Sequence, residues 1–435
     1  MLRSVIVVAG KDPLLIDGGS ESYLRAYGRA AIRAGYMPNF FSLGTQDVVE
    51  ETEFGIVHRV RSPFRPFRGL MVAAHRGYIV RAVDRFVGTE KGPHLIHSFG
   101  PWGGVGLAVS KRLRQRNIDA IPIITAFGTY NHETRGKLRG LRLTKMPLTW
   151  LQHVWELLWT RIAVDPNEGR GYRSSKVVLV NYDSVQRIIS HQFGNGISFG
   201  KMTYASEAAF LQHETTRSEL PEPIARLEPK DAPLLVSVSR HDPRKGVDVL
   251  LRALAALRKR GTQFRACLIG GGQLLVAHRA LAYQLGLTSC VAVPGRVPDA
   301  YTYLGYADVF ALPSLEEGSG SVSLLEAMQA RAAAVVTRVD GLPEDVVDGE
   351  SALFVEPGDV DALAEALGRL FTDANLRARI AAGGYRQYRV RFSADAFAAD
   401  LQRVYTILGF PPLASFAGNE LKQPPSPDRR QTVDQ

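Results

Sequence analysis

Three glutamates and a glycine-rich segment carry the residue types of a ligand-binding loop. Glu316 and Glu317 lead into Gly318-Ser319-Gly320-Ser321, and Glu326 follows inside a predicted helix. Glycines that open a helix leave backbone N–H groups and the positive end of the helix dipole directed at one place, which suits a phosphate. Carboxylates repel phosphate, so these glutamates would instead accept hydrogen bonds from hydroxyl groups. A phosphate joined to many hydroxyls describes a nucleotide sugar.

A plainer interpretation of the same residues stays open on local grounds. Ser323-x-x-Glu326 has the spacing of a capping box, in which the glutamate only satisfies backbone donors at the helix start. Glu316 and Glu317 could equally be loop charges in water. The choice between the two interpretations depends on the remainder of the chain.

A second loop carries cations that could neutralise a diphosphate. Arg240 and Lys245 lie in the segment Ser239-Arg240-His241-Asp242-Pro243-Arg244-Lys245-Gly246. Their two charges could hold a diphosphate from one side while the glycine loop holds it from the other. The alternative, two solvated loop cations, loses weight once the acidic and glycine-rich loop is considered with this segment.

Both loops follow short apolar runs that predict buried strands, Leu234–Val238 and Val309–Leu312. Strand patterns alternate with helical patterns along both halves of the chain, which predicts βα units and parallel sheets. Such sheets bind ligands at the carboxyl ends of their strands, where both loops fall. Further strands are predicted at 4–8, 38–42, 56–60, 94–97, 121–125, 266–269, 333–337 and 352–355. Helices are predicted at 20–35, 247–260, 360–371, 375–392 and 394–408.

The composition indicates a globular chain of two or three domains. The 435 residues are 45% hydrophobic, and no run approaches the ~18 apolar residues that a membrane span needs. The N-terminal Met-Leu-Arg leads into an apolar run that is too short for a secretory signal. Cys267 and Cys290 supply neither a disulfide framework nor a metal-ligand set, so no metal site is expected. Two buried thiols fit a reducing cytoplasm.

Charge divides the chain near residue 212. Residues 1–212 hold 28 Lys and Arg against 16 Asp and Glu, whereas the remainder holds 25 against 27. A basic half beside a nearly neutral half predicts two domains with different partners. The predicted organisation is an N-terminal domain (1–212), a proline-bearing linker (213–233), a second domain (234–393), one more amphipathic helix (394–410) and a disordered tail (411–435).

The basic half interleaves cations with aromatic residues. One such run is Phe64, Arg65, Phe67, Arg68, Arg76, Tyr78, Arg81 and Arg85, and a second basic run is Arg135, Lys137, Arg139, Arg142 and Lys145. The second run precedes a helical stripe of Trp150, Leu151, Val154, Trp155, Leu158, Trp159 and Ile162. This pattern is typical of an interfacial helix on an anionic lipid surface. The alternative is a core helix packed on the sheet beside a solvated charge run.

Taken in order, these motifs resemble those of the retaining glycosyltransferases of family four, which have the GT-B fold. The matching segments are Gly18-Gly19 after the first strand, Arg240 and Lys245, Gly270-Gly271-Gly272, Gly295-Arg296-Val297, Pro313–Met328 and Gly341-Leu342-Pro343-Glu344. The resemblance implies two Rossmann-like parallel-sheet domains facing across a cleft, the first for the acceptor and the second for the nucleotide sugar. It also implies that the helix from Ala394 crosses back to the N-terminal domain.

The resemblance further implies a role for each matched residue. Arg240, Lys245 and Glu317 would be catalytic: the two cations would hold the donor diphosphate and steady the leaving group, and Glu317 would contact the transferred sugar. Glu326 would bind the ribose hydroxyls. The implied donor-binding set is Gly18, Gly19, Arg240, Lys245, Glu316, Glu317, Gly318, Ser319, Gly320, Ser321 and Glu326. Transfer would retain the anomeric configuration without a metal ion, the leaving phosphate helping to deprotonate the acceptor hydroxyl. The nucleotide sugar would be a co-substrate, with no other cofactor.

Two features depart from the family pattern. Eight residues separate Glu317 from Glu326, one more than is usual, so either Glu316 or Glu317 could face the sugar. Phe127 stands where the family often has a histidine that helps to position the donor sugar. His97 and His132 lie nearby in the sequence, but neither occupies the matching position.

The predicted function is sugar transfer from a nucleotide-sugar donor to a hydroxyl acceptor that is lipid-linked or a cell-envelope polysaccharide intermediate. The enzyme would be cytoplasmic and peripheral on the cytoplasmic face of the membrane. Three alternatives stay open. A GT-B epimerase or phosphorylase would differ in its need for an acceptor alcohol, and a catalytically silent binder would hold nucleotide sugar without turnover. A nucleic-acid binder would lose affinity steeply with salt, but no recognised nucleic-acid-binding motif accompanies the basic charge.

Overall fold

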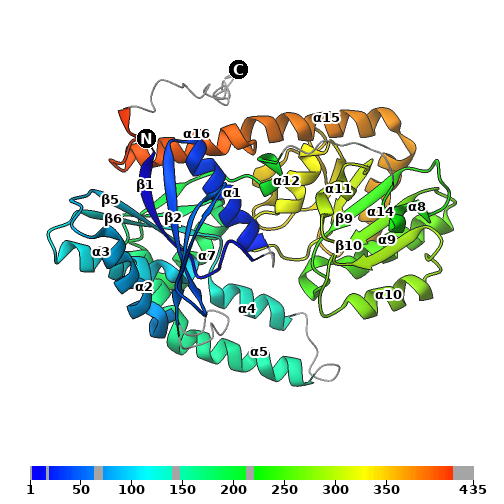
Figure 1. The fold of residues 1–435 in the computed structure, drawn as a ribbon. Coiled ribbons are helices and arrows are strands. Elements are labelled where there is room, and N and C mark those ends of the chain that lie inside the picture. Colours follow the sequence, from blue (N-terminus) through cyan, green and yellow to red (C-terminus); the bar gives the residue numbers. More distant parts are fainter. Residues whose placement is uncertain (1, 16–18, 63–71, 140–146, 212–219, 415–435) are drawn as a thin grey trace, which may run out of the picture.

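The computed structural model describes residues 2–15, 19–62, 72–139, 147–211 and 220–414. They form two domains, each built on its own β-sheet, that lie side by side (Figure 1). The two domains face each other with the carboxyl ends of their strands. At this junction α4, which follows a strand of the first sheet, contacts the loop after β9 of the second. The GT-B architecture that the motifs predicted is confirmed.

Among the described residues, the first sheet has eight strands in the order β3-β4-β2-β1-β5-β6-β7-β8. All neighbours are parallel except the antiparallel pair β3–β4. Alternate residues of β1 enter different cores, Val5 and Val7 one and Ile6 and Val8 the other, so both faces of the sheet are covered by helices. The strands are β1 (Arg3–Val8), β2 (Tyr36–Gly44), β3 (Val48–Thr52), β4 (Gly55–Arg61), β5 (His94–Phe99), β6 (Ala120–Ala126), β7 (Val177–Val180) and β8 (Phe199–Lys201). The helices of this half are α1 (Gly19–Arg33), α2 (Val72–Val87), α3 (Gly103–Arg114), α4 (Tyr130–Arg139), α5 (Pro147–Trp159), α6 (Asp165–Ser174) and α7 (Asp183–Phe193).

The second sheet is parallel throughout its described strands, in the order β11-β10-β9-β12-β13-β14. Its strands are β9 (Leu234–Val238), β10 (Arg265–Ile269), β11 (Val291–Gly295), β12 (Val309–Leu312), β13 (Ala333–Thr337) and β14 (Leu353–Val355). The helices are α8 (Glu222–Ala225), α9 (Val247–Lys259), α10 (Leu275–Gln284), α11 (Ala300–Leu304), α12 (Val322–Gln329), α13 (Leu342–Asp345), α14 (Val360–Thr372), α15 (Ala374–Arg391) and α16 (Ala394–Ile407). This sheet places β9 and β12 side by side, so the two loops singled out in the sequence leave neighbouring strands.

The last two helices join the domains. α15 packs on α12 and β13 of the second domain, and α16 continues along the same side of the molecule onto α1 of the first (Figure 1). The hydroxyl of Tyr405 on α16 lies 2.6 Å from that of Tyr27 and 2.7 Å from Nδ1 of His97, all three being buried. Burial lowers the pKa of His97 to about 3, so this imidazole is neutral. His97 therefore belongs to the anchor of the crossing helix.

The predicted boundary at residues 212–213 lies outside the described residues. The second part of the predicted linker contains α8, which packs against β10 and β11 and buries Ile224 completely. The domain limits themselves stay predictions, as does the disorder of the tail, of which residues 415–435 are not described.

Candidate active site

Two loops at the carboxyl edge of the second sheet are packed together as one unit. One leaves β9 and contains the single turn Pro243–Lys245, and the other leaves β12 at Pro313. Gly246 has φ 59°, and a Cβ on it would lie 2.1 Å from the Pro313 carbonyl oxygen. Only glycine fits there, both for its conformation and for the close approach. The N–H of Leu315 also donates to the carbonyl of Arg244 at 2.6 Å.

Lys245 and Glu317 form an ion pair between these two loops. Nζ of Lys245 lies 2.6 Å from Oε2 of Glu317, and the side chains are only 13% and 4% exposed. The other carboxylate oxygen accepts a hydrogen bond from the Ser314 hydroxyl. The structure thus brings together two of the three residues expected to be catalytic, and it uses Glu317 to orient Lys245.

The two arginines of the β9 loop have different surroundings. Arg240 has a largely exposed side chain whose Nε lies 3.6 Å from Oδ2 of Asp242, so it is held only loosely. Arg244 is buried, and its Nε has no hydrogen-bond partner among the described residues. Its side chain runs beneath Gly136 of α4, where a Cβ would come within 2.9 Å of Cδ. The sequence analysis assigned no role to Arg244. Its place at the site is visible only from the packing of α4 on this loop.

The glycine loop before α12 uses part of its backbone to bind an aspartate. The N–H groups of Glu317 and Gly318 both donate to Oδ2 of Asp340 at 2.7 Å. Asp340 has φ 46°, an uncommon backbone region for a residue other than glycine. These two amides are therefore not available to a phosphate, contrary to the expectation for the whole loop. The amides of residues 319–323, which include those of the expected donor site at Ser319, Gly320 and Ser321, donate to no acceptor in the described part of the chain.

Glu326 lies on α12 without capping it. The N-cap residue is Ser321, which makes no capping bond, and its hydroxyl lies instead 3.0 Å from that of Ser323. The capping-box alternative is therefore wrong. Burial raises the pKa of Glu326 to about 8, and the carboxylates of Asp299 and Glu207 add to the effect. A carboxyl in these surroundings can accept hydrogen bonds from hydroxyl groups, and it repels anions once it is ionised.

Glu316 faces the first domain. Its Oε1 lies 3.3 Å from Nε2 of His132, which is in the first turn of α4. A Cβ on Gly136, one turn further along α4, would lie 2.5 Å from the same oxygen. The two neighbouring glutamates therefore point to different places, Glu317 to Lys245 and Glu316 to α4. His132, which does not match the family histidine by sequence position, nevertheless reaches this loop.

Tyr182, at the end of β7, fills the space between two glycines of the second domain. A Cβ on Gly320 would lie 1.8 Å from its hydroxyl oxygen, and one on Gly341 would lie 2.5 Å from its ring. The Tyr182 hydroxyl lies 2.8 Å from Oδ2 of Asp345 and 2.8 Å from the hydroxyl of Tyr204. Burial raises the pKa of Asp345 to about 7. A side chain of the first domain thus holds the glycine loop of the second, which no spacing in the sequence indicates.

Gly19 and Phe127 are positions of the first domain, named in the sequence analysis, that the structure describes. Gly18 is outside the described residues, and Gly19 begins α1 with open space around its α-carbon. Phe127 packs its ring against Tyr23, with centroids 4.6 Å apart, and joins the core of the domain. The position at which the family resemblance implies a histidine is therefore used for packing in this chain.

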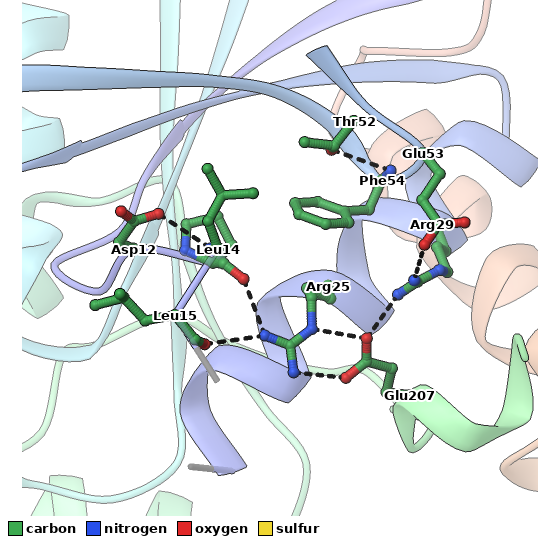
Figure 2. Close-up of polar contacts among 10 residues, drawn as sticks. Asp12, Leu14, Leu15, Arg25, Arg29, Thr52, Glu53, Phe54 and Glu207 are labelled. Atoms are coloured by element: carbon green, nitrogen blue, oxygen red, sulfur yellow. Dashed lines mark hydrogen bonds and ion pairs between the residues drawn. The ribbon is translucent and has the colours of Figure 1, made fainter. Parts of the chain in front are cut away.

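Arg25 of α1 fixes the chain that follows β1 (Figure 2). It donates to the carbonyls of Pro13 and Leu15 at 2.9 and 3.1 Å, and it makes two hydrogen bonds of 2.7 Å to the carboxylate of Glu207. Arg29 shares the same carboxylate at 2.9 Å. Glu207 is one of the groups that raise the pKa of Glu326. This bidentate contact ties the loop after β1 to the edge of the acidic corner.

Within the described ranges, no three His, Cys, Asp or Glu side chains are grouped in a way that could hold a metal ion. Cys267 and Cys290 are free and buried. The positive groups at the site are the side chains of Arg240, Lys245 and Arg244, joined by the amides that precede α12. The arrangement can therefore offer cations and N–H donors to phosphates, and carboxylates to hydroxyls.

Known proteins resemble this chain in sequence and in fold. A family model described as Glycosyl transferases group 1 matches residues 222–387. The chain is 34% identical over 178 residues to a GDP-mannose-dependent alpha-(1-6)-phosphatidylinositol monomannoside mannosyltransferase of Mycolicibacterium smegmatis, which is 38% of this chain and 47% of that protein. The chain thus spans about half the length of this relative.

A second relative is matched over more of its length. The chain is 35% identical over 282 residues to the lipopolysaccharide core biosynthesis glycosyltransferase LpsD of Rhizobium meliloti, covering 60% of this chain and 80% of LpsD. A sucrose-phosphate synthase from Thermosynechococcus elongatus shares the fold with a TM-score of 0.68 at 20% identity, over 94% of this chain and 99% of that one. The chain therefore belongs to the group 1 glycosyl transferases, the family-four enzymes of GT-B fold that its motifs predicted.

Proposed function

We propose that this protein transfers a hexose from a nucleotide-sugar donor to a hydroxyl of a lipid-linked or cell-envelope acceptor, with retention and without a metal ion. The observation that carries the proposal is the buried Lys245–Glu317 pair beside the free amides of the α12 loop. It presents one ammonium group, oriented by a carboxylate, where a diphosphate would meet the start of a helix. Two relatives support the same class of reaction: the name of the first states a GDP-mannose donor and a phosphatidylinositol mannoside, and the name of LpsD states lipopolysaccharide core biosynthesis.

In this proposal each site residue acts on one part of the donor. Lys245 and the exposed side chain of Arg240 neutralise the diphosphate and the leaving nucleoside diphosphate, which removes the need for a metal ion. Glu326 accepts hydrogen bonds from the ribose hydroxyls. Because the carboxylate of Glu317 is already taken up by Lys245 and Ser314, it acts mainly by holding Lys245, and Glu316 is the better placed of the two to meet the sugar.

The acceptor class is inferred from helix α5, in which large apolar side chains face the solvent. The apolar side chains of its outer stripe are exposed: Leu148 82%, Leu151 54%, Trp155 68%, Leu158 52% and Ile162, just past the helix, 73%. Two polar side chains of the helix, His153 and Glu156, are buried instead, and Glu156 accepts hydrogen bonds from Tyr130 and His153 at 2.9 Å each. The alternative of a core helix is therefore wrong for the exposed members of the predicted stripe, whereas Trp150 and Val154 are half-buried.

An exposed stripe of this size requires a partner, because monomers rarely leave such a face in water. The excess positive charge of residues 1–212 makes an anionic bilayer the fitting partner, since each cation near such a surface contributes about 1 kcal/mol. Arg135 is exposed beside this helix, whereas the side chains of Lys137, Arg139, Arg142 and Lys145 are not among those described. In the described part of the chain no helix combines the length and apolarity needed to cross a bilayer. We infer a peripheral enzyme that lies on the membrane through α5.

The double variant Trp155→Ser/Ile162→Ser is expected to bind anionic vesicles at least about tenfold more weakly, because each large apolar side chain contributes roughly 1.5–3 kcal/mol on full burial. Folding should be unaffected, since both side chains are exposed. Co-sedimentation with phosphatidylglycerol vesicles at low and high salt measures the effect. Tyr283→Ser/Val276→Ser on α10 is the matched control, with side chains 76% and 77% exposed. Equal binding by both variants, or wild type that ignores anionic lipid, contradicts the docking proposal.

Transfer itself is tested with labelled nucleotide sugars and a lipid extract as acceptor. We expect label in the lipid fraction, the anomeric configuration of the donor in the product, and no loss of rate with EDTA. Nuclear magnetic resonance of the product reports the configuration. An inverted product, or a rate that depends on added divalent metal, would remove retention or metal independence from the proposal. Label found only in soluble sugar would remove the lipid acceptor.

A further inference from the structure

A hollow of about 410 Å³ opens in the first domain between β4 and α2. Its lining residues are Asp47, Val60, Arg61, Tyr78, Arg81, Ala82 and Arg85. None of them belongs to the candidate active site, to α5 or to the loop after β1. The volume falls in the range of cavities that bind small organic ligands. The hollow is therefore a separate place where a ligand could bind.

The hollow is lined by three arginines and by one carboxylate, so its lining carries a net positive charge. No carboxylate in the described ranges comes within ion-pair distance of the guanidinium groups of Arg61, Arg81 or Arg85. The single acidic lining residue, Asp47, uses Oδ1 to accept the backbone N–H of Arg61 at 2.8 Å. Asp84, which neighbours Arg85 in the sequence, turns away and pairs with Arg112 and Arg116 on the side of α3.

The connection between β4 and α2 adds no acidic residue to the sequence of this region. Residues 63–71 contain two arginines and no Asp or Glu. Arg81 and Arg85 are also one helical turn apart, where like charges repel each other. Such an arrangement costs stability unless an anion occupies the hollow.

The walls of the hollow favour an anion that carries an organic group. Val60 and Ala82 give it an apolar side, and the guanidinium of Arg81 stacks over the ring of Tyr78 at 4.9 Å, which holds that cation in place. Arginine presents a planar pair of donors that matches phosphate oxygens. We propose that this hollow is a binding site for a phosphate ester, separate from the donor site. The ester is either the headgroup of an anionic phospholipid or a soluble sugar or glycerol phosphate.

The test compares Arg81→Gln/Arg85→Gln with the matched control Arg379→Gln/Arg386→Gln, which removes the same charge from exposed positions on α15. One arm measures the thermal shift with glycerol 3-phosphate. The other measures co-sedimentation with vesicles of phosphatidylcholine containing about one-third phosphatidylglycerol, at low salt. Neither arm depends on transfer activity, so failure of the proposed function would leave the result interpretable.

Loss of two charge-assisted contacts should weaken binding by at least about tenfold in one arm, while the control matches wild type. Weakening with glycerol 3-phosphate alone identifies a soluble ester, and weakening with vesicles identifies a lipid headgroup. If the hollow variant and the control behave alike in both arms, Arg81 and Arg85 act only through the net charge of the protein, and the proposal is overturned. Wild type that binds neither probe overturns it as well.

Discussion

Replacing Lys245 by alanine should lower the free energy of unfolding by on the order of 3 kcal/mol, because it leaves the carboxylate of Glu317 buried without a cation. The double variant Lys245→Ala/Glu317→Gln should recover most of that loss, since a neutral amide can still accept from the Ser314 hydroxyl. Chemical denaturation of the three proteins measures both effects. Arg226→Ala, which breaks an exposed pair with Glu222, is the control and should change stability by less than about 1 kcal/mol.

The double variant separates folding from binding. It restores a neutral site but not the ammonium group, so its affinity for nucleoside diphosphates should stay weaker than that of wild type by about 10- to 150-fold, the scale of one charge-assisted hydrogen bond. A double variant that is stable and binds like wild type would show that Lys245 serves only the fold.

Glu326→Gln should stabilise the protein and weaken nucleotide binding at once. The pKa of Glu326 is raised to about 8 from an ordinary value of 4.5, so between these values the folded state binds more protons than the unfolded state. The contribution of the protonated Glu326 to the free energy of unfolding is complete below about pH 4.5, and it is lost as the pH rises through about 8. Glutamine cannot ionise, so the melting temperature of the variant should exceed that of wild type increasingly toward about pH 8. Thermal denaturation as a function of pH measures the difference.

Nucleotide binding should respond in the opposite direction, because ribose hydroxyls that donate to this side chain favour the ionised carboxylate, which glutamine cannot form. We expect about tenfold weaker binding, measured at the same pH values. A gain in stability without loss of affinity would identify Glu326 as a strained core carboxyl with no ligand. A loss of affinity without the pH-dependent gain would mean that the carboxyl is ionised in the free protein.

Much of the fold could be predicted because its strands are buried on both faces. Leu234–Val238, Val309–Leu312 and Ala333–Thr337 are continuous apolar runs, and they form strands with these same bounds. β3 (Val48–Thr52) escaped prediction because it is an exposed edge strand with no apolar alternation, and it exists through its pairing with β4.

Helix α5 shows what periodicity leaves undetermined. The spacing of its apolar residues predicts a helix and a stripe, but it does not say whether the stripe meets the core or the solvent. That depends on Tyr130 and His153, which give the buried Glu156 its hydrogen bonds and so turn the polar face inward. One of these partners lies in another helix, outside any local sequence pattern.

In the candidate site, too, the sequence predicted which residues take part but not the contacts between them. Motif spacing located Lys245 and the two glutamates, because these residues lie on loops whose strands are easily recognised. The contacts that give them their roles join segments far apart in the chain, such as His132 with Glu316 and Tyr182 with Gly320. These contacts depend on how the two domains meet, which composition and spacing do not specify.

The central claim is that the loops after β9 and β12 bind the diphosphate of a nucleotide sugar. Calorimetric titration of the wild-type protein with uridine, guanosine and adenosine diphosphates, and with their hexose conjugates, tests it most directly. We expect one of the three bases to bind at a single site, in the absence of metal ions, and to lose that binding in Lys245→Ala/Glu317→Gln while the fold persists. Wild-type protein that binds none of these nucleotides, or a double variant that binds them equally well, would contradict the account.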